Sequence, residues 1–132
     1  MAERPHALSL FLCDQVVFEQ RTNKPTLVGV FTGVACSAFP SVPQNLDVFA
    51  SLTNGHGDVV LDLQVIRLAT DEQINGQSIE VTFPDPLTVF NLRFRFRQLS
   101  FPEPGDYLFQ LSCDGDVICH RRIHVYGRED DS

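Results

Sequence analysis

The feature that most constrains the fold of this chain is an alternation of apolar and polar residues with a period of two. The segment VFNLRFRFRQ at residues 89–98 shows it most clearly. Its apolar and polar members strictly alternate: Phe90, Leu92, Phe94 and Phe96 against Asn91, Arg93, Arg95 and Arg97. A helical period would spread the arginines around an axis, whereas an extended strand places them all on one face. The segment therefore predicts a strand with an apolar core face and a basic outer face.

The same alternation recurs along the chain between turn signals rich in Gly, Pro, Asn and Asp. The apolar sets are Leu46, Val48, Ala50 and Leu52; Val59, Leu61, Leu63 and Val65; and Ile79, Val81 and Phe83. The segment TLVGVFTGVAC at residues 26–36 is apolar on both parities, which predicts a strand covered on both faces. No amphipathic helix longer than two turns is evident. The pattern predicts an all-β protein, an antiparallel Ig-like β-sandwich of about eight strands.

A chain of 132 residues suffices for one domain. We expect that domain to span residues 7–126, with flexible tails at 1–6 and 127–132. The chain has eleven Phe and no Trp, which suits the inner faces of packed sheets. We expect one core that contains the following residues: Phe83, Phe90, Phe94, Phe96 and Phe109.

The segment YLFQLSCDGDVICHRRIHVY at residues 107–126 has two apolar runs around Asp114-Gly115, which predicts a hairpin with a type I′ turn. That register pairs Cys113 with Asp116, Leu111 with Ile118 and Phe109 with His120, and places Cys113 and Cys119 on opposite faces. A shift in apolar parity predicts a β-bulge near Arg121-Arg122. A three-residue loop, which stays an alternative, would return both cysteines to one face. His120 and His124 would lie about 13 Å apart, too far to share a zinc ion.

Just before this hairpin, Tyr107 follows Gly105 by two residues and opens a strand. This placement resembles the tyrosine corner of immunoglobulin-like sandwiches, in which the hydroxyl bonds backbone in the preceding loop. A core Trp and the second cysteine of a true immunoglobulin domain are missing.

Several segments, in this order, resemble one family of short bacterial proteins of unknown function. They are LCDQVVFEQRTNKPTLVGVF, Phe39-Pro40, LTNGHG and FPEPGDYLFQL followed by Asp114-Gly115. The resemblance implies a small cytoplasmic β-sandwich and supplies no activity, substrate or catalytic residue. Asp14 and Lys24 fall within these segments. We interpret Asp14 as bonding nearby backbone and Lys24 as part of an Asn-Lys-Pro turn, and a functional role for either residue stays an alternative.

Catalytic and metal-binding signatures are absent from the sequence. It contains no nucleophile elbow, zinc-protease, P-loop or dinucleotide motif. Cysteines 13, 36, 113 and 119 match no zinc or redox spacing, and no loop has the dense carboxylate pattern of a calcium site. We expect buried reduced thiols, no metal, no cofactor and no enzymatic activity. A Cys13 or Cys36 nucleophile paired in space with a histidine stays a rival hypothesis.

The net charge of −7 argues against nucleic acid and anionic membranes as partners. The N-terminal residues lack a secretory signal, and no apolar run is long enough to span a bilayer. We therefore expect a cytoplasmic protein, in which thiols stay reduced.

Without a catalytic or metal-binding motif, the remaining candidates for function are surface residues that could bind a partner. The stripe of Arg93, Arg95 and Arg97 is either a solvated face, paired with Glu80 or Asp62 across strands, or an acceptor for an acidic partner. Phe49, Val60 and Leu108 are apolar at positions that point outward, and would mark an interface if they cluster. The sequence favours a non-enzymatic protein-interaction module that binds a partner or itself as a homodimer. A structural subunit of a larger assembly is the alternative. The stripe predicts a complex that weakens with salt and with Arg95→Glu.

Overall fold

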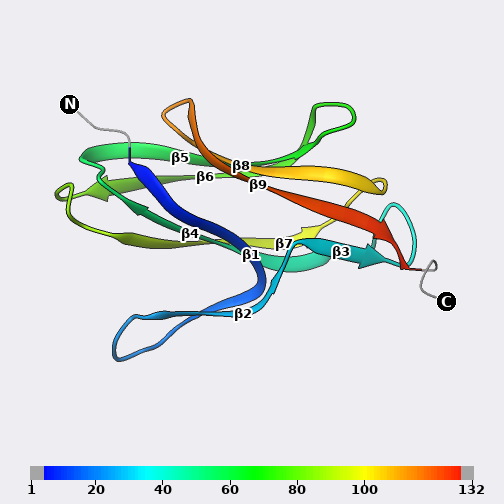
Figure 1. The fold of residues 1–132 in the computed structure, drawn as a ribbon, viewed down its shortest axis with the longest axis horizontal. Helices are drawn as coiled ribbons and strands as arrows, with labels where there is room; N and C mark the ends of the chain where they lie inside the picture. The colour runs from blue at the N-terminus through cyan, green and yellow to red at the C-terminus, as the bar shows by residue number, and fades with distance from the viewer. Residues whose placement is uncertain (1–4, 129–132) are drawn as a thin grey trace.

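The computed structural model describes residues 5–128, which form nine β-strands and no α-helix (Figure 1). In chain order the strands are β1 (His6–Phe18), β2 (Pro25–Phe31), β3 (Gly33–Cys36), β4 (Gln44–Thr53), β5 (Gly57–Arg67), β6 (Glu72–Phe83), β7 (Phe90–Leu99), β8 (Gly105–Cys113) and β9 (Asp116–Gly127). β1 begins and β9 ends one residue beyond the expected domain bounds, so His6 and Gly127 belong to strands and not to tails. Of the rest of the expected tails, Pro5 and Arg128 are described, and Pro5 is buried, whereas residues 1–4 and 129–132 lie outside the described residues. No described helix is long and apolar enough to cross a membrane.

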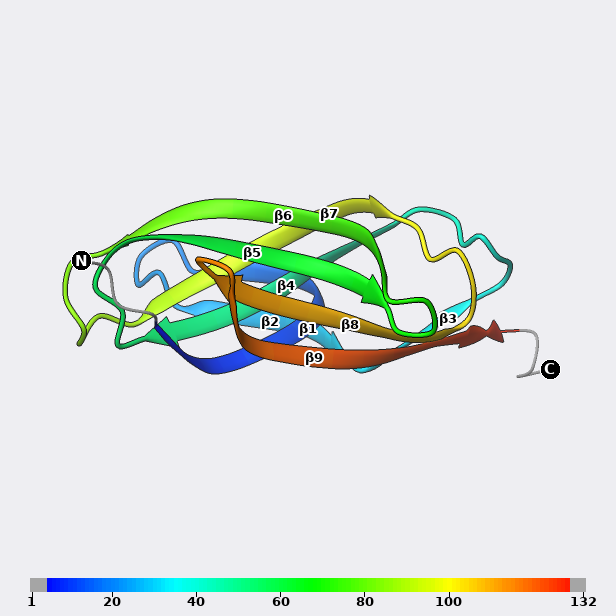
Figure 2. The ribbon, with the colours of Figure 1, turned by 90° about the horizontal axis from the view of Figure 1, so that it is seen from above.

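The strands form two layers, which confirms the predicted β-sandwich. One sheet has the order β2-β1-β4-β7 and the other the order β3-β9-β8-β5-β6. Seen from above, the strands of the two sheets cross at an angle (Figure 2). Among the described residues the β3–β9 pair is parallel and the other pairs are antiparallel, where the sequence predicted antiparallel strands throughout.

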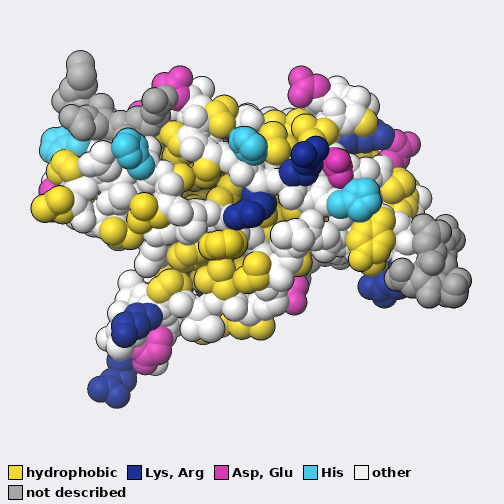
Figure 3. Space-filling model, viewed as in Figure 1, with side chains coloured by type: hydrophobic (Ala, Val, Ile, Leu, Met, Phe, Trp, Pro, Cys, Tyr) yellow, Lys and Arg dark blue, Asp and Glu magenta, His cyan; other side chains and the backbone are white. Residues whose placement is uncertain are grey.

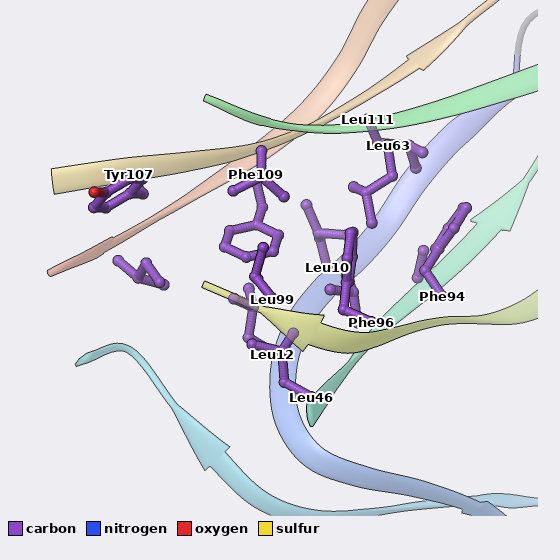
Figure 4. Packing of buried hydrophobic residues seen from close by; sticks show 14 of the residues in the cluster. Leu10, Leu12, Leu46, Leu63, Phe94, Phe96, Leu99, Tyr107, Phe109 and Leu111 are labelled. Carbon is purple, nitrogen blue, oxygen red and sulfur yellow. The ribbon is translucent and has the colours of Figure 1, made fainter. Parts of the chain in front are cut away.

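The apolar faces of both sheets meet in one core. Phe83, Phe94, Phe96 and Phe109 are buried there, and Phe90 packs against them, as predicted. The rings of Phe96 on β7 and Phe109 on β8 meet edge to face with 5.9 Å between centroids, which joins the sheets at the middle of the sandwich (Figure 4). The alternation seen in the sequence therefore records which face of each strand enters this core.

The prediction for residues 26–36 is wrong in an informative way. This segment is not one strand covered on both faces, because it leaves the four-stranded sheet after Phe31 and joins the five-stranded sheet at Gly33. Its first half, β2, lies at a sheet edge with Val28 47% and Val30 54% exposed. The parallel β3–β9 pair follows from this crossing, since the chain keeps its direction as it changes sheets. In β2, apolar residues at both odd and even positions belong to an exposed edge strand and not to a buried one.

The β1–β2 hairpin bends where Asp14 faces Gly29. The ladder between the strands pairs Cys13 with Val30 and Gln15 with Val28, and skips Asp14 and Gly29 between them. Gly29 has a φ of 68°, a conformation that favours glycine, and a Cβ there would overlap the Asp14 carboxylate, which would have to move aside. Beyond the bend, Val16 packs against Cys13 and Phe49 in a small second core. The end of the hairpin therefore lies over the outer face of its own sheet.

The β8–β9 hairpin confirms the turn and corrects the register beyond it. Asp114 and Gly115 both have positive φ, and Cys113 pairs with Asp116, as predicted. Leu111 then pairs with Cys119 and Phe109 with Arg121, in place of Ile118 and His120, because β9 carries a bulge between Val117 and Cys119.

This bulge lies next to the turn and not near Arg121-Arg122, where the sequence placed it. It shifts every later residue of β9 by one position. Cys113 and Cys119 therefore both face the core, contrary to the prediction of opposite faces. All four cysteines are free thiols.

The tyrosine-corner hydrogen bond predicted for Tyr107 is present. The buried Tyr107 hydroxyl donates to the Glu103 carbonyl oxygen at 2.6 Å, and so ties the start of β8 to the loop before it. This bond satisfies a polar group that would otherwise be costly to bury.

Candidate interaction surface

The arginine stripe lies on the outer face of β7, as predicted, but its members have different environments. β7 pairs with β4, so Arg95 lies opposite Asp47. Arg95 Nε donates to Asp47 Oδ1 at 3.2 Å, and Asp47 is 3% exposed. The expected partners Glu80 and Asp62 belong to the other sheet and do not serve this stripe. The pairing order of the strands, which the sequence does not show, decides the partner.

Asp47 connects three strands. Its Oδ2 accepts a hydrogen bond from the Val16 backbone N–H at 2.8 Å, and its backbone oxygen accepts one from the Cys13 thiol at 3.7 Å. Arg93 Nη1 donates to the Val16 carbonyl at 3.2 Å, and its guanidinium lies 5.7 Å from the Phe18 ring centroid. Asp47 and Arg93 thus hold both backbone groups of Val16, which fixes the β1–β2 hairpin against the sheet.

Sequence reasoning missed Asp47. The available signal was its position, a carboxylate within the otherwise apolar run from Leu46 to Ala50. Such a residue needs a buried partner.

Arg97 is the member of the stripe that remains available. It is exposed and makes no hydrogen bond or ion pair with any described residue. The stripe therefore contains two structural arginines and one that faces solvent.

The three outward apolar candidates do not cluster. Phe49 is buried under the β1–β2 hairpin in the second core. Val60 on β5 and Leu108 on β8 lie on the other sheet. Leu108 is beside Ile66, six residues along β5 from Val60, a distance of about 20 Å. These three residues form no common surface.

A different apolar surface is present on the β1–β2 hairpin. Its exposed large side chains are Phe11, Val17, Val28 and Val30. Hydrophobic side chains gather over β1 and β2 in the space-filling view, and basic side chains lie at the hairpin tip (Figure 3). Within the described residues β2 pairs with β1 alone, so its other edge carries unpaired backbone groups. The hairpin thus combines an apolar face with an open strand edge, and we name Val17, Val28, Val30 and the β2 edge the hairpin surface.

Two adjoining depressions lie beside the bend of the hairpin. The first, the polar hollow, has a volume of about 240 Å³, and its polar lining includes Asp14, Asn45, Arg95 and Arg97. The second, the apolar groove, has a volume of about 420 Å³. Its apolar lining is Val30, Phe31, Val34, Ala35 and Leu46, and Gln44 and Arg128 add polar groups to its wall. Asp14, Asn45 and Leu46 line both.

The two polar residues singled out with the family resemblance have clear positions. Lys24 lies in the turn between β1 and β2, where its carbonyl accepts a hydrogen bond from Glu19 N–H at 2.9 Å, as predicted. The Asp14 carboxylate lies against Gly29 and makes no hydrogen bond with the described residues, so the expected bond to nearby backbone is absent.

Two of the thiols, those of Cys13 and Cys119, are in environments that suppress their reactivity. Burial raises the pKa of Cys119 to about 11, and burial followed by the nearby Asp47 charge raises the pKa of Cys13. A thiol that stays protonated is a poor nucleophile.

His124 Nδ1 lies 2.9 Å from Asp106 Oδ1 on an exposed strand face, stacked on Tyr126. Residues 5–128 contain no group of three His, Cys, Asp or Glu side chains able to hold a metal ion.

A comparison with models of protein families identifies the family of this chain. Residues 8–126 match the model of a family of unknown function, DUF6941. The chain belongs to this family. The match confirms the resemblance drawn from the ordered turn and core segments. It spans almost the whole of the sandwich, from β1 into the end of β9.

Other comparisons add little. No curated protein matches the chain. Among solved structures, a beta-glucosidase from Listeria innocua aligns with a TM-score of 0.47 and 11% identity, covering 80% of this chain and 18% of the enzyme. The same enzyme in complex with isofagomine aligns with a TM-score of 0.45 and 9% identity, covering 93% and 16%. The chain thus spans less than a fifth of these enzymes, and such likeness supports no conclusion about its activity.

Proposed function

We propose that this DUF6941 protein is a non-enzymatic protein-interaction module, in which β2 accepts an extended segment of a partner as an added strand. The observation that carries the proposal is the exposed apolar edge at Val28 and Val30. Natural edge strands are usually protected by charged side chains, prolines or covering elements. Beyond its first residue, Pro25, β2 has no proline and no charged side chain. Such an apolar edge suits strand addition, in which backbone groups supply affinity and alternate side chains supply specificity.

The other long edges are better protected. At the edge of β7, the Arg95 carbonyl accepts a hydrogen bond from Gln77 Nε2 at 2.6 Å. β6 carries Glu72 and Glu80 and a row of polar side chains. β2, by contrast, has no charged residue between Pro25 and Phe31. The two anchors on Val16 hold the hairpin in place, so little order has to be gained on binding.

Local charge beside β2 favours an acidic segment as the partner. The net charge of −7 opposes any acidic protein as much as a second copy, so the attraction has to come from nearby cations. Arg21 and Lys24 lie in the turn before β2. Arg97, on β7, lines the polar hollow that adjoins the groove beside Gly29–Phe31, so an acidic segment that follows β2 and continues into the hollow meets cations at both places. Such complementarity mainly steers and orients the encounter.

Substitution of the edge valines tests the proposal. Wild-type protein and the variants Val28→Lys and Val30→Lys are used to capture partners from lysate of the native host, with mass spectrometric identification. Val117→Lys is the matched control, because Val117 is 50% exposed on β9, on the other sheet. We expect a partner that wild type and Val117→Lys recover and both edge variants lose, with equal melting temperatures. Recovery of the same partners by all four proteins would contradict the proposal.

Light scattering coupled to gel filtration separates partner binding from self-association. We expect a monomer at micromolar concentration. A dimer that Val28→Lys disrupts would instead support self-association through the same edge. Arg95→Glu is unsuitable as an interface probe, because it would place a second carboxylate against buried Asp47.

Thiol reactivity tests the enzyme alternative. At pH 8 we expect iodoacetamide to label the folded protein slowly at all four cysteines, and quickly once it is denatured. Cys36 and Cys113 are buried away from the reagent, and burial keeps Cys13 and Cys119 protonated. One cysteine that reacts fast in the folded state would favour a thiol-dependent enzyme.

A further inference from the structure

The polar hollow is lined by two carboxylates, Asp14 and Asp47, and by the guanidinium groups of Arg95 and Arg97. Asp47 is paired with Arg95, which leaves Arg97 as the cation available to an anion. Arg95 and Arg97 are alternate residues on one strand face, about 6.7 Å apart along β7, and both line the hollow. Arg95 uses Nε to bind Asp47, which fixes the direction of its guanidinium. Arg97 makes no hydrogen bond or ion pair with any described residue. One oriented and one available guanidinium fit a carboxylate, which arginine can bind through two parallel hydrogen bonds.

The Asp14 carboxylate adds a hydrogen-bond acceptor beside the two arginines, which are donors. It lies at the junction of the two depressions and has no hydrogen-bond donor among the described residues. A carboxylate in that state accepts an N–H group readily. A ligand that satisfies this site therefore carries an anion for Arg97 and an N–H donor for Asp14.

The apolar groove adds a third requirement. It shares Asp14, Asn45 and Leu46 with the polar hollow, so a ligand that fills both has its carboxylate and an apolar group close together. The last residue of a peptide has this arrangement: an α-carboxylate, a backbone N–H and a side chain on one carbon atom. The groove, at about 420 Å³, has room for a large aliphatic or aromatic side chain.

We propose that the polar hollow and the apolar groove together bind the C-terminal residue of an extended peptide whose last side chain is apolar. The α-carboxylate binds Arg97 and Arg95, the last N–H donates to Asp14, and the side chain lies in the groove. The inference rests on the proposed function, because it states which part of the partner this end of the hairpin recognises. The groove begins at the Gly29–Phe31 end of β2, so a segment that runs parallel to β2 brings its last residue there.

Small probes test this site without any knowledge of the partner. ¹⁵N-labelled full-length protein is titrated by NMR with N-acetyl-leucine, with its amide N-acetyl-leucinamide, and with N-acetylglycine. We expect N-acetyl-leucine to shift the resonances of Gly29, Asn45, Leu46 and the Arg97 side chain. The amide lacks the anion and N-acetylglycine lacks the side chain, so each should bind at least about tenfold more weakly, a difference of about 1.4 kcal/mol.

Two variants assign the effect to named residues. Arg97→Gln should weaken N-acetyl-leucine about tenfold and leave the amide unchanged. Arg122→Gln, a substitution of an exposed arginine on the other sheet, is the matched control and should change neither. Equal binding of acid and amide by the wild type, absence of binding, or shifts confined to other surfaces would overturn the inference.

The outcomes also distinguish this site from strand addition at β2. If the probe binds as expected while Val28→Lys retains every partner, the terminal site stands and strand addition fails. If Val28→Lys loses its partner while acid and amide bind equally, strand addition stands and the terminal site fails.

Discussion

At the scale of single residues, the Asp47 carboxylate has the widest structural role. One of its oxygens accepts a bond from Arg95 and the other from the Val16 backbone, so a side chain on β4 joins β7 to the end of β1. Burial of a charge is favourable only when its partners are complete. The position of the β1–β2 hairpin therefore depends on this one group.

Replacement of Asp47 measures that dependence. Asp47→Asn removes the charge that balances Arg95 and should lower the free energy of unfolding by about 1–3 kcal/mol, below the largest values for buried pairs because Arg95 is partly exposed. Asp71→Asn is the control, since Asp71 is exposed and has a φ of 60° that Asn tolerates. Urea unfolding of both variants is the measurement. Equal stability of the two would contradict the role given to Asp47.

The Cys119 thiol predicts how stability depends on pH. Its pKa is raised from 9.0 to about 11, chiefly by burial. A raised pKa stabilises the folded state below the unfolded value of 9, and this contribution is lost as the pH rises toward 11. With a discount for partial exposure, the loss is about 1–2 kcal/mol.

Comparison with Cys119→Ala isolates this contribution from the other groups that titrate above pH 9. The stability difference between wild type and variant should be largest at pH 8 and should shrink by about 1–2 kcal/mol at pH 11. Chemical denaturation at each pH measures it. A difference that stays constant across this range would show that the thiol pKa is unshifted.

At the scale of elements, the bend in the β1–β2 hairpin positions the hairpin surface. Gly29 supplies a left-handed conformation, and the absence of a side chain leaves room for the Asp14 carboxylate. The bend turns Val16 toward the sheet and leaves Val28 and Val30 exposed. A local backbone requirement thus decides which side chains a partner can reach.

Gly29→Ala tests this bend. The substitution combines a strained φ with an overlap at Asp14, so it should destabilise the protein by about 2–3 kcal/mol. Hydrogen exchange should accelerate in β1 and β2 while β5 and β8 stay protected. The double variant Asp14→Ala/Gly29→Ala removes the overlap but keeps the strain, and should recover part of the loss. Full tolerance of Gly29→Ala would contradict the geometry.

Prediction from sequence succeeded where one strand determines the answer and failed where two strands must be known. The alternation in β7 reveals which face of that strand enters the core, and Asp114-Gly115 reveals the turn of the β8–β9 hairpin, because both are local patterns. The partner of Arg95 depends on the neighbour of β7, which no local pattern records. The bulge in β9 was predicted from parity but placed too far from the turn. β2 was misjudged because an exposed apolar edge and a buried strand have the same composition.

At the scale of the whole molecule, aromatic packing between the sheets stabilises the sandwich. Phe94 is 1% exposed in that core. Phe94→Ala should reduce the free energy of unfolding by about 3–5 kcal/mol through lost burial and a residual cavity. Thermal and urea unfolding of the variant measure this, and an unchanged midpoint would contradict the placement of Phe94. Far-ultraviolet circular dichroism should show a β spectrum without helical minima.

The central claim is that a partner adds a strand at the edge of β2, and hydrogen exchange of the complex tests it most directly. Amides of residues 26–31 that face the open edge have no strand partner among the described residues, so the captured partner should slow their exchange. Edge strand β6 serves as the internal reference and should be unchanged. Protection on β2 that Val28→Lys abolishes is the predicted result. Protection confined to β6, or to the outer face of the five-stranded sheet, would contradict the account.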